Sequence, residues 1–285
     1  MKRMGIVLLL LVATAAVAQS PILRAAHSRS AGAESEELFR KTASEVLARD
    51  FPSADLSYLL LDLRTRTFIT KRWPGSDKEI PVGSLVKPFT AIAYAQAHAF
   101  RFPEFTCTPG ACWYPHGHGK LNIVHAIALS CNAYFINLAS DVEPEQVITL
   151  ARSFGLSGPG MSTSPDALAG RYGVWQESPE ALARAYAELL SRRDQPGVRE
   201  IVRGMAMSAR EGTAAGITSQ KSKVSALAKT GTAPCTHTNH EPGDGFVAMA
   251  WPAESPQYLL LLRYHGNPGA HAAIVAGKML KALQP

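Results

Sequence analysis

The sequence predicts a mixed α/β (α+β) fold, in which an antiparallel sheet is sandwiched by helices and an all-helical lobe is inserted into the sheet domain. Apolar runs of strand length occur near both ends of the chain, at 56–73 and at 224–264. The residues between these runs read mainly as helices, and the chain has no internal repeat. We therefore expect one sheet built from both ends of the chain. The expected domain covers residues 34–285, and its lobe covers about 88–210.

The first elements are a helix and a hairpin. Residues 34–51 carry an apolar stripe with helical spacing. The almost unbroken apolar run LSYLLLDL (56–63) reads as a strand, RTRT as a turn and FITKRW as the partner strand. Such a run predicts a long hairpin that is buried on both faces.

The middle of the chain predicts helices around one loop. A helix is expected over 84–100, and the Pro- and Gly-rich residues 103–120 read as a loop. Residues 121–139 read as helical with an interruption near Ser130-Cys131-Asn132, and 144–195 contain further helices, one of them starting at Pro179. The chain then returns to strands at 224–233, 244–251 and 257–264 and closes with the helix GAHAAIVAGKMLKAL.

The N-terminus reads as an export signal. MKRMGIVLLLLVATAAVAQS has a basic start, an apolar stretch and small residues before Ala18. We expect a signal peptide over 1–18 and a linker over 19–33, hence a periplasmic or secreted protein. The alternative, an uncleaved anchor, is less favoured because the apolar stretch is short for a membrane span.

The charge pattern argues against a nucleic-acid partner. The formal charge of +6 includes Lys2 and Arg3, which lie in the expected signal, so the mature chain is weakly basic. It has neither a basic run nor the interleaving of basic and aromatic residues found in nucleic-acid modules. A substrate that carries a carboxylate fits this charge.

The segment VGSLVKPF (82–89) suggests an activated nucleophile. Ser84 is a residue type that often caps a helix, and Lys87 follows one helical turn later on the same side. Pro88 falls early enough that its missing N–H costs no helical hydrogen bond. Taken alone, this short pattern favours a capped surface helix with a solvated lysine, because short motifs match by chance.

Two further motifs follow in order, Ser130-Cys131-Asn132 and Lys229-Thr230-Gly231-Thr232. Together the three motifs resemble the transpeptidase domain of the serine penicillin-binding proteins, and the class B type more than the β-lactamases. The segments CWYPHGHGKLNIVHAIALSCNAYFINLA and EGTAAG, the latter just before AKTGTA, are also similar to that family. The resemblance covers roughly residues 50–285.

The chemistry of the catalytic residue types fits this family. Ser84 would attack a carbonyl and form an acyl-enzyme. Lys87 can act as its base if burial and a second ammonium, that of Lys229, lower its pKa. Ser130 can relay a proton between the two lysines and the leaving amine.

The remaining motif residues would bind the substrate. Asn132 can hydrogen-bond an amide side chain, and Gly231 lets an extended substrate approach the strand closely. Thr230 and Thr232 offer hydroxyls to a carboxylate. The resemblance implies an oxyanion hole made of the backbone N–H groups of Ser84 and Thr232.

The resemblance implies a transpeptidase that acts on the D-Ala-D-Ala end of peptidoglycan stem peptides, is acylated by β-lactams and needs no cofactor. Glu177 is expected to be a surface or capping residue rather than a base for deacylation, which favours slow hydrolysis. A β-lactamase or D,D-carboxypeptidase is one alternative. A non-catalytic penicillin-binding or sensor module is the other, because only about 30 residues separate the expected signal from the domain, where class B proteins carry a further module and a membrane anchor. Cell-envelope proteins are further partners that the sequence does not identify.

Four cysteines allow three full pairings. A turn-like TPGA separates Cys107 from Cys112, so we expect a local disulfide there. Cys235, His237 and His240 have a spacing that could hold zinc, with His116 and His118 as further imidazoles. Because no fourth ligand is evident, we favour a polar loop over 235–241 and expect no metal site.

Overall fold

The structure is a computed structural model that describes residues 37–160, 164–235 and 243–284. The chain divides into a unit that ends at Thr42 and a compact unit from Ala43 to Pro285. Of the first unit, residues 37–42 are described and are helical. The expected signal peptide and linker lie outside the described residues. Among the described helices, none is both long and apolar enough to span a bilayer.

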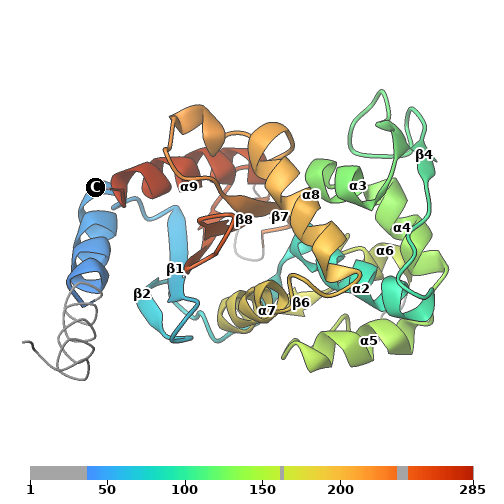
Figure 1. Ribbon diagram of the computed structural model, residues 1–285, viewed down its shortest axis with the longest axis horizontal. Coiled ribbons are helices and arrows are strands. Elements are labelled where there is room, and N and C mark those ends of the chain that lie inside the picture. The colour runs from blue at the N-terminus through green and yellow to red at the C-terminus, as the bar shows by residue number, and fades with distance from the viewer. Residues whose placement is uncertain (1–36, 161–163, 236–242, 285) are drawn as a thin grey trace, which may run out of the picture. The chain divides into compact units, whose positions relative to one another are not determined.

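The second unit contains one five-stranded antiparallel sheet (Figure 1). In spatial order its strands are β2 (Phe68–Arg72), β1 (Leu56–Asp62), β9 (Tyr258–Tyr264), β8 (Asp244–Trp251) and β7 (Leu227–Ala233). Strands from both ends of the sequence thus share one sheet, which confirms the expected fold class. The β1–β2 hairpin is buried less completely than expected. Every residue of β1 is buried but β2 is only partly so, because β2 is an edge strand.

The two faces of the sheet pack against different helices. Leu59, Leu261 and Ala248 are cross-strand neighbours, and they share one apolar core with the helix α7 (Pro179–Ser191). The alternate residues of these strands, such as Leu60 and Met249, point to the opposite face, where α9 (Gly269–Ala282) contacts β7, β8 and β9. Burial on both faces explains why the central strands read as continuous apolar runs.

Helices are the main regular structure in the chain between the two groups of strands. They are η1 (Gly83–Val86), α2 (Lys87–Ala97), α3 (Ile123–Leu129), α4 (Asn132–Ser140), α5 (Pro144–Ser153), α6 (Pro165–Leu168), α7 and α8 (Val198–Glu211), followed by η2 (Thr218–Gln220). Figure 1 shows α2 to α6 gathered beside the sheet, beyond the β7 edge. The expected helical lobe is therefore present, while its boundaries stay a prediction.

Two short strand pairs lie inside this helical part and were not predicted. β3 (Ile80–Pro81) pairs with β6 (Gln176–Glu177), and β4 (Phe105–Cys107) pairs with β5 (Gly119–Leu121). Two or three residues are too few for a recognisable alternating pattern. The second pair turns the expected loop over 103–120 into a hairpin.

Helix α7 shows how local sequence fixes the contact between lobe and sheet. The hydroxyl of Ser178 accepts a hydrogen bond from the N–H of Ala181, and Pro179 occupies the first turn. Leu182, Tyr186 and Leu189 then follow at helical spacing, and all three are buried. Burial of each such side chain stabilises the fold by about 1.5–3 kcal/mol.

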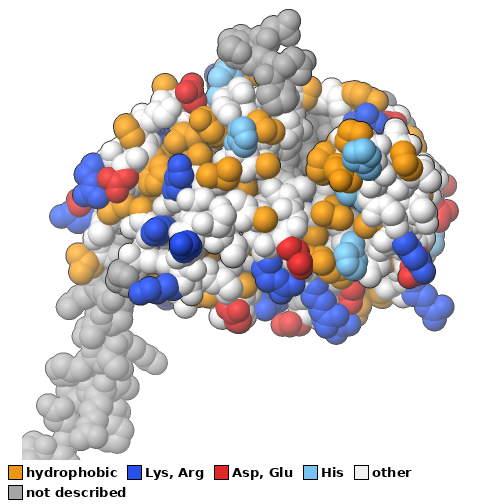
Figure 2. Space-filling model, turned by 90° about the horizontal axis from the view of Figure 1, so that it is seen from above, with side chains coloured by type: hydrophobic (Ala, Val, Ile, Leu, Met, Phe, Trp, Pro, Cys, Tyr) orange, Lys and Arg blue, Asp and Glu red, His pale blue; other side chains and the backbone are white. Residues whose placement is uncertain are grey.

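The surface has mixed charge. On the face seen in Figure 2, Lys and Arg side chains are interspersed with Asp and Glu. Ion pairs such as Lys120–Glu104 and Arg192–Glu188 lie on the described surface. This mixture agrees with the weakly basic charge expected for the mature chain.

Candidate active site

Ser84 lies on the 3₁₀ turn η1 rather than at the N-cap of an α-helix. The helix α2 begins at Lys87, and its N-cap is Val86, which provides no side-chain cap. The expected capping role of Ser84 is therefore wrong, because the tighter turn comes first. Ser84 is partly exposed, whereas its neighbours Gly83, Leu85 and Val86 are buried. The turn thus presents a single hydroxyl at the surface of a packed segment.

Lys87 begins α2 and is fully buried. Its Nζ donates hydrogen bonds to the carbonyl oxygen of Ser130 at 2.9 Å and to Oδ1 of Asn132 at 2.6 Å. It also lies 3.4 Å from the hydroxyl of Ser130 and 5.4 Å from the centre of the Phe135 ring. The amine is therefore held by the second motif. Among the described residues it makes no hydrogen bond to Ser84.

The second motif is a turn between two helices, as the sequence predicts. Ser130 ends α3 in the left-handed conformation with φ 52°, and Asn132 begins α4 after Cys131. A left-handed serine is uncommon and persists where its surroundings fix it. Here the Ser130 carbonyl accepts from Lys87 and, at 3.3 Å, from the indole N–H of Trp113. Trp113 is a site residue that the sequence does not predict, because its only signal is its place within the segment that is similar to the family.

Lys229 supplies the second amine from strand β7. It pairs with Ala248 in the sheet register, so its side chain points to the face that packs on the lobe. It is fully buried, and its Nζ lies 2.8 Å from the Ser130 hydroxyl and 2.6 Å from the carbonyl oxygen of Thr230. The Ser130 hydroxyl therefore lies between the two amines.

Burial is the main influence on the pKa of both lysines. It lowers the pKa of Lys87 to about 7, assisted by Arg171 and opposed by Cys112 and Cys131, whose negative charge would raise it. The pKa of Lys229 is also lowered, first by burial and then by Lys87. Two buried amines that share one hydroxyl cannot both be charged without a large penalty, so a neutral amine is available near neutral pH.

Gly83 and Gly231 allow the turn and the strand to lie against each other. A side chain on Gly83, whose φ is 57°, would collide with the carbonyl oxygen of Thr232. A side chain on Gly231 would lie 3.0 Å from both the Leu85 side chain and the Val82 carbonyl oxygen. This close approach brings the backbone of Ser84 next to that of Thr232, as an oxyanion hole made of both requires.

The two threonines of the third motif differ in burial and in the hydrogen bonds of their hydroxyls. The Thr230 hydroxyl is buried and lies 2.6 Å from that of Thr213. Thr232 is exposed, and its hydroxyl accepts from the N–H of Gly269 at 3.0 Å, which leaves its own proton free for a carboxylate. Thr213 belongs to EGTAAG, a segment that is similar to the family, but the sequence does not predict its hydrogen bond to Thr230.

Glu177 is neither a surface residue nor a helix cap. It is fully buried on β6, where its carboxylate accepts from the N–H groups of Ser157 and Gly158 and from the Trp175 indole, at 2.9, 2.9 and 2.7 Å. These three hydrogen bonds fix the position of the carboxylate, and its role is therefore structural. A carboxylate engaged in this way is poorly suited to activate water, which agrees with the expectation that it is not a deacylating base.

The cysteines are not paired as expected. Cys107 and Cys112 are free thiols, as are Cys131 and Cys235. Cys112 Sγ instead lies 3.8 Å from Cys131 Sγ, because the loop after β4 folds back onto the second motif. His237 and His240, which the sequence offered as possible zinc ligands with Cys235, lie outside the described residues. Cys235 is placed near His265 and Asp244.

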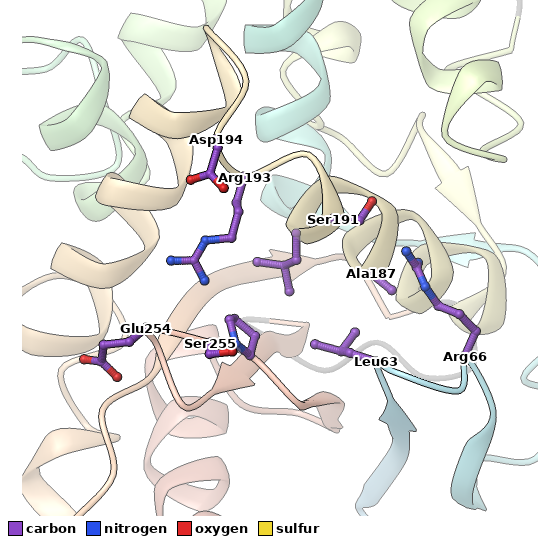
Figure 3. Close-up of a pocket in the computed structure, with 10 residues that line it drawn as sticks. Leu63, Arg66, Ala187, Ser191, Arg193, Asp194, Glu254 and Ser255 are labelled. Atoms are coloured by element: carbon purple, nitrogen blue, oxygen red, sulfur yellow. The ribbon is translucent and has the colours of Figure 1, made fainter. Parts of the chain in front are cut away.

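A separate hollow of about 420 Å³ lies beside the end of α7 (Figure 3). Arg66, Arg193 and Glu254 are among its lining residues, and the Arg193 guanidinium also donates to the carbonyl oxygen of Ala253 at 3.3 Å. None of the lining residues belongs to the three motifs. The candidate site is therefore the one formed by η1, the α3–α4 turn and β7.

Comparison with solved structures supports the fold. A Pseudomonas aeruginosa PBP2, solved in complex with WCK 5153, has a TM-score of 0.66 and 16% identity over 85% of this chain and 75% of its own. A Helicobacter pylori PBP2, solved in complex with MreC, has a TM-score of 0.71 and 17% identity over 86% of this chain. The match spans 62% of that longer protein. The transpeptidase domain of a Burkholderia pseudomallei penicillin-binding protein 3 has a TM-score of 0.61 and 15% identity, with 85% and 92% covered.

The sequence itself decides the family. No curated protein matches the chain. The family model described as the penicillin binding protein transpeptidase domain matches residues 66–283, about three quarters of the sequence. This range includes all three motifs that converge on Ser84, Lys87 and Lys229. The chain therefore belongs to the penicillin-binding protein transpeptidase domain family.

Proposed function

We propose that this chain is an exported serine acyltransferase that acts on the D-Ala-D-Ala end of peptidoglycan stem peptides and is acylated by β-lactams. One observation carries the proposal. Two fully buried amines, Lys87 and Lys229, lie on either side of the Ser130 hydroxyl, next to the turn that presents Ser84. Burying two amines is costly, and such costs are concentrated at sites that use a perturbed pKa.

The proposed reaction proceeds in two steps. Ser84 Oγ attacks the carbonyl carbon of the penultimate residue, and its proton passes to neutral Lys87. The N–H groups of Ser84 and Thr232 stabilise the developing oxyanion. The amide C–N bond then breaks, and Ser130 gives its hydroxyl proton to the leaving D-alanine amine while it takes up the proton that Lys87 received from Ser84. In the second step an acceptor amine attacks the acyl-enzyme and restores the Ser84 hydroxyl.

The substrate would bind along the outer edge of β7. This strand ends the sheet, so its outer N–H and C=O groups can pair with an extended peptide. Asn132 would contact an amide of the substrate, and the free proton of Thr232 would bind its terminal carboxylate. Thr230 would take part only if its hydroxyl leaves Thr213, with which it is paired.

The first test is the intact mass of the protein during incubation with penicillin, with Ser84→Ala alongside. We expect one persistent adduct on the wild type and none on the variant. An adduct that disappears while free penicillin is hydrolysed would indicate a β-lactamase instead. Folded wild-type protein that never forms an adduct would contradict the proposal and favour a non-catalytic module.

A further inference from the structure

Four potential metal ligands meet beside the second motif. Cys107 ends β4, Cys112 lies in the following loop, His118 lies just before β5, and Cys131 lies between Ser130 and Asn132. One ligand atom from each residue lies within 4.8 Å of every other. Such a set of three thiols and one imidazole occurs in structural zinc sites.

The separations between these atoms fit tetrahedral coordination. With Zn–S bonds of about 2.3 Å and a Zn–N bond of about 2.0–2.1 Å, two sulfur ligands of a tetrahedron are about 3.8 Å apart, and a sulfur and a nitrogen are about 3.6 Å apart. Cys112 Sγ lies 3.8 Å from Cys131 Sγ, and Cys107 Sγ lies 3.6 Å from His118 Nδ1. Both separations therefore match edges of such a tetrahedron.

The backbone around the cluster is built to hold these side chains together. Cys107 is paired with Gly119 at the neck of the β4–β5 hairpin, which places His118 beside it. Gly117 has a φ of 68°, and a side chain there would collide with the carbonyl oxygen of Cys107. The N–H of Asn132 donates to Cys112 Sγ at 3.2 Å, a bond that would orient a metal-bound thiolate.

We propose that Cys107, Cys112, His118 and Cys131 bind one zinc ion, and that this ion fixes the Ser130–Asn132 turn. Four protein ligands leave no open position, so the ion would be structural and would not contact substrate. Cys107 and Cys131 are buried, while Cys112 and His118 are partly exposed and leave a path for the ion to enter. Binding would release the thiol protons to solvent.

The proposal replaces the expected Cys107–Cys112 disulfide with a metal-bound pair of thiolates. It also explains how a long loop with the exposed aromatic residues Trp113 and Tyr114 is held without a core of its own. The metal site itself does not depend on the proposed acyltransferase activity. Only the effect of zinc on Ser130 and on acylation rests on the proposed function.

The decisive measurement is X-ray absorption at the zinc edge, with metal analysis of the full chain purified with reductant and no chelator. We expect one zinc per chain, with three sulfur ligands at about 2.3 Å and one nitrogen at about 2.0–2.1 Å. Metal-free protein would overturn the proposal, whether its thiols are free or paired as Cys107–Cys112 or Cys112–Cys131, which mass analysis after alkylation of free thiols distinguishes. So would zinc bound through oxygen and nitrogen only.

Two matched pairs of variants locate the ion. Cys112→Ser should lose nearly all the zinc, whereas Cys235→Ser, at the other described cluster, should keep it. His118→Ala should lose zinc, and His116→Ala, two residues away, should retain it. Zinc that is lost only with Cys235→Ser would place the ion at the other cluster and contradict the proposal. If a variant does not fold, the sulfur and nitrogen count of the wild type still decides, and it does so without reference to penicillin.

Discussion

Ser130 is the residue on which the site depends most. Its carbonyl and hydroxyl oxygens both contact Lys87 Nζ, and its hydroxyl also accepts from Lys229. It adopts φ 52°, a conformation that costs about 1–2 kcal/mol for a residue with a side chain. The two lysines and Trp113 together hold it there. A single strained residue thus links the two buried amines.

Removing the Ser130 hydroxyl should affect chemistry more than folding. We expect Ser130→Ala to slow acylation by penicillin by about 10²–10⁴-fold, the usual contribution of a positioned proton-transfer group. The second-order rate constant from time-resolved intact mass checks this. Ser140→Ala is the matched control, since that exposed hydroxyl bonds only to the Ile136 carbonyl of its own helix. Equal rates for the two variants would remove Ser130 from the proton path.

The acylation rate should depend on pH through Lys87. A lowered pKa means that the neutral amine, the form able to act as base, predominates above about pH 7. We expect the rate to rise about tenfold per unit below pH 7 and to level off above it. The charged and titratable groups that influence this amine are Lys229, Arg171, Cys112 and Cys131.

Stopped-flow acylation at a series of pH values checks this profile, and a flat profile would exclude Lys87 as the base. Lys87→Arg is the accompanying variant. A guanidinium stays protonated throughout this range, so the variant should lose acylation at every pH tested.

At the scale of elements, the site is an alignment of η1 with β7. Tyr186 of α7 anchors η1, because its buried hydroxyl donates a hydrogen bond to the Leu85 carbonyl oxygen at 2.7 Å. Gly83 then lies directly against the Thr232 backbone. The turn is therefore held between a helix and a strand that lie far apart in the sequence.

Gly83→Ala should separate these two elements. Two positive-φ glycines allow a comparison, because Gly83 has no room for a side chain and Gly110 has nothing within 4 Å. Both substitutions carry the backbone cost of about 1–2 kcal/mol. Gly83→Ala should cost about 1–3 kcal/mol more through overpacking, and it should also slow acylation. Urea unfolding together with penicillin acylation measures both effects. Equal losses for the two variants would contradict the close contact between η1 and β7.

At the scale of the whole second unit, lobe and sheet share one apolar core. Leu59 and Leu261 of the sheet belong to the same cluster as Phe89 of α2 and Leu182 of α7. The helical lobe therefore lacks a separate interior. A continuous core favours one cooperative unfolding transition over two.

We accordingly expect tryptophan fluorescence and far-ultraviolet circular dichroism to give coincident urea curves. Leu85→Ala, at a fully buried position of η1, should lower the free energy of unfolding by about 2–5 kcal/mol and shift both curves together. Curves that separate would show that lobe and sheet unfold independently.

The sequence predicts the long elements and the three motifs because each has a local signal. Continuous apolar runs mark β1, β8 and β9, and Lys87 and Lys229 stand out once the motifs are read in order. What it misses depends on contacts between distant segments. The short pairs β3–β6 and β4–β5, the burial of Glu177 and the Thr213–Thr230 hydrogen bond are all of this kind. The partners of Cys112 are another example, since a turn-like TPGA favours Cys107 whereas folding brings Cys131 close.

Strand β7 ends the sheet, and this has a consequence for solubility. An unpaired strand edge accepts any extended chain, including another copy of the same protein, and proteins usually block such edges. Here the edge cannot be blocked without excluding the proposed substrate. Of the residues of β7 only Thr232 is exposed, so self-association would compete with the proposed substrate at that end of the strand. Occupancy of that edge by a bound peptide or acyl group should suppress aggregation as well as catalysis.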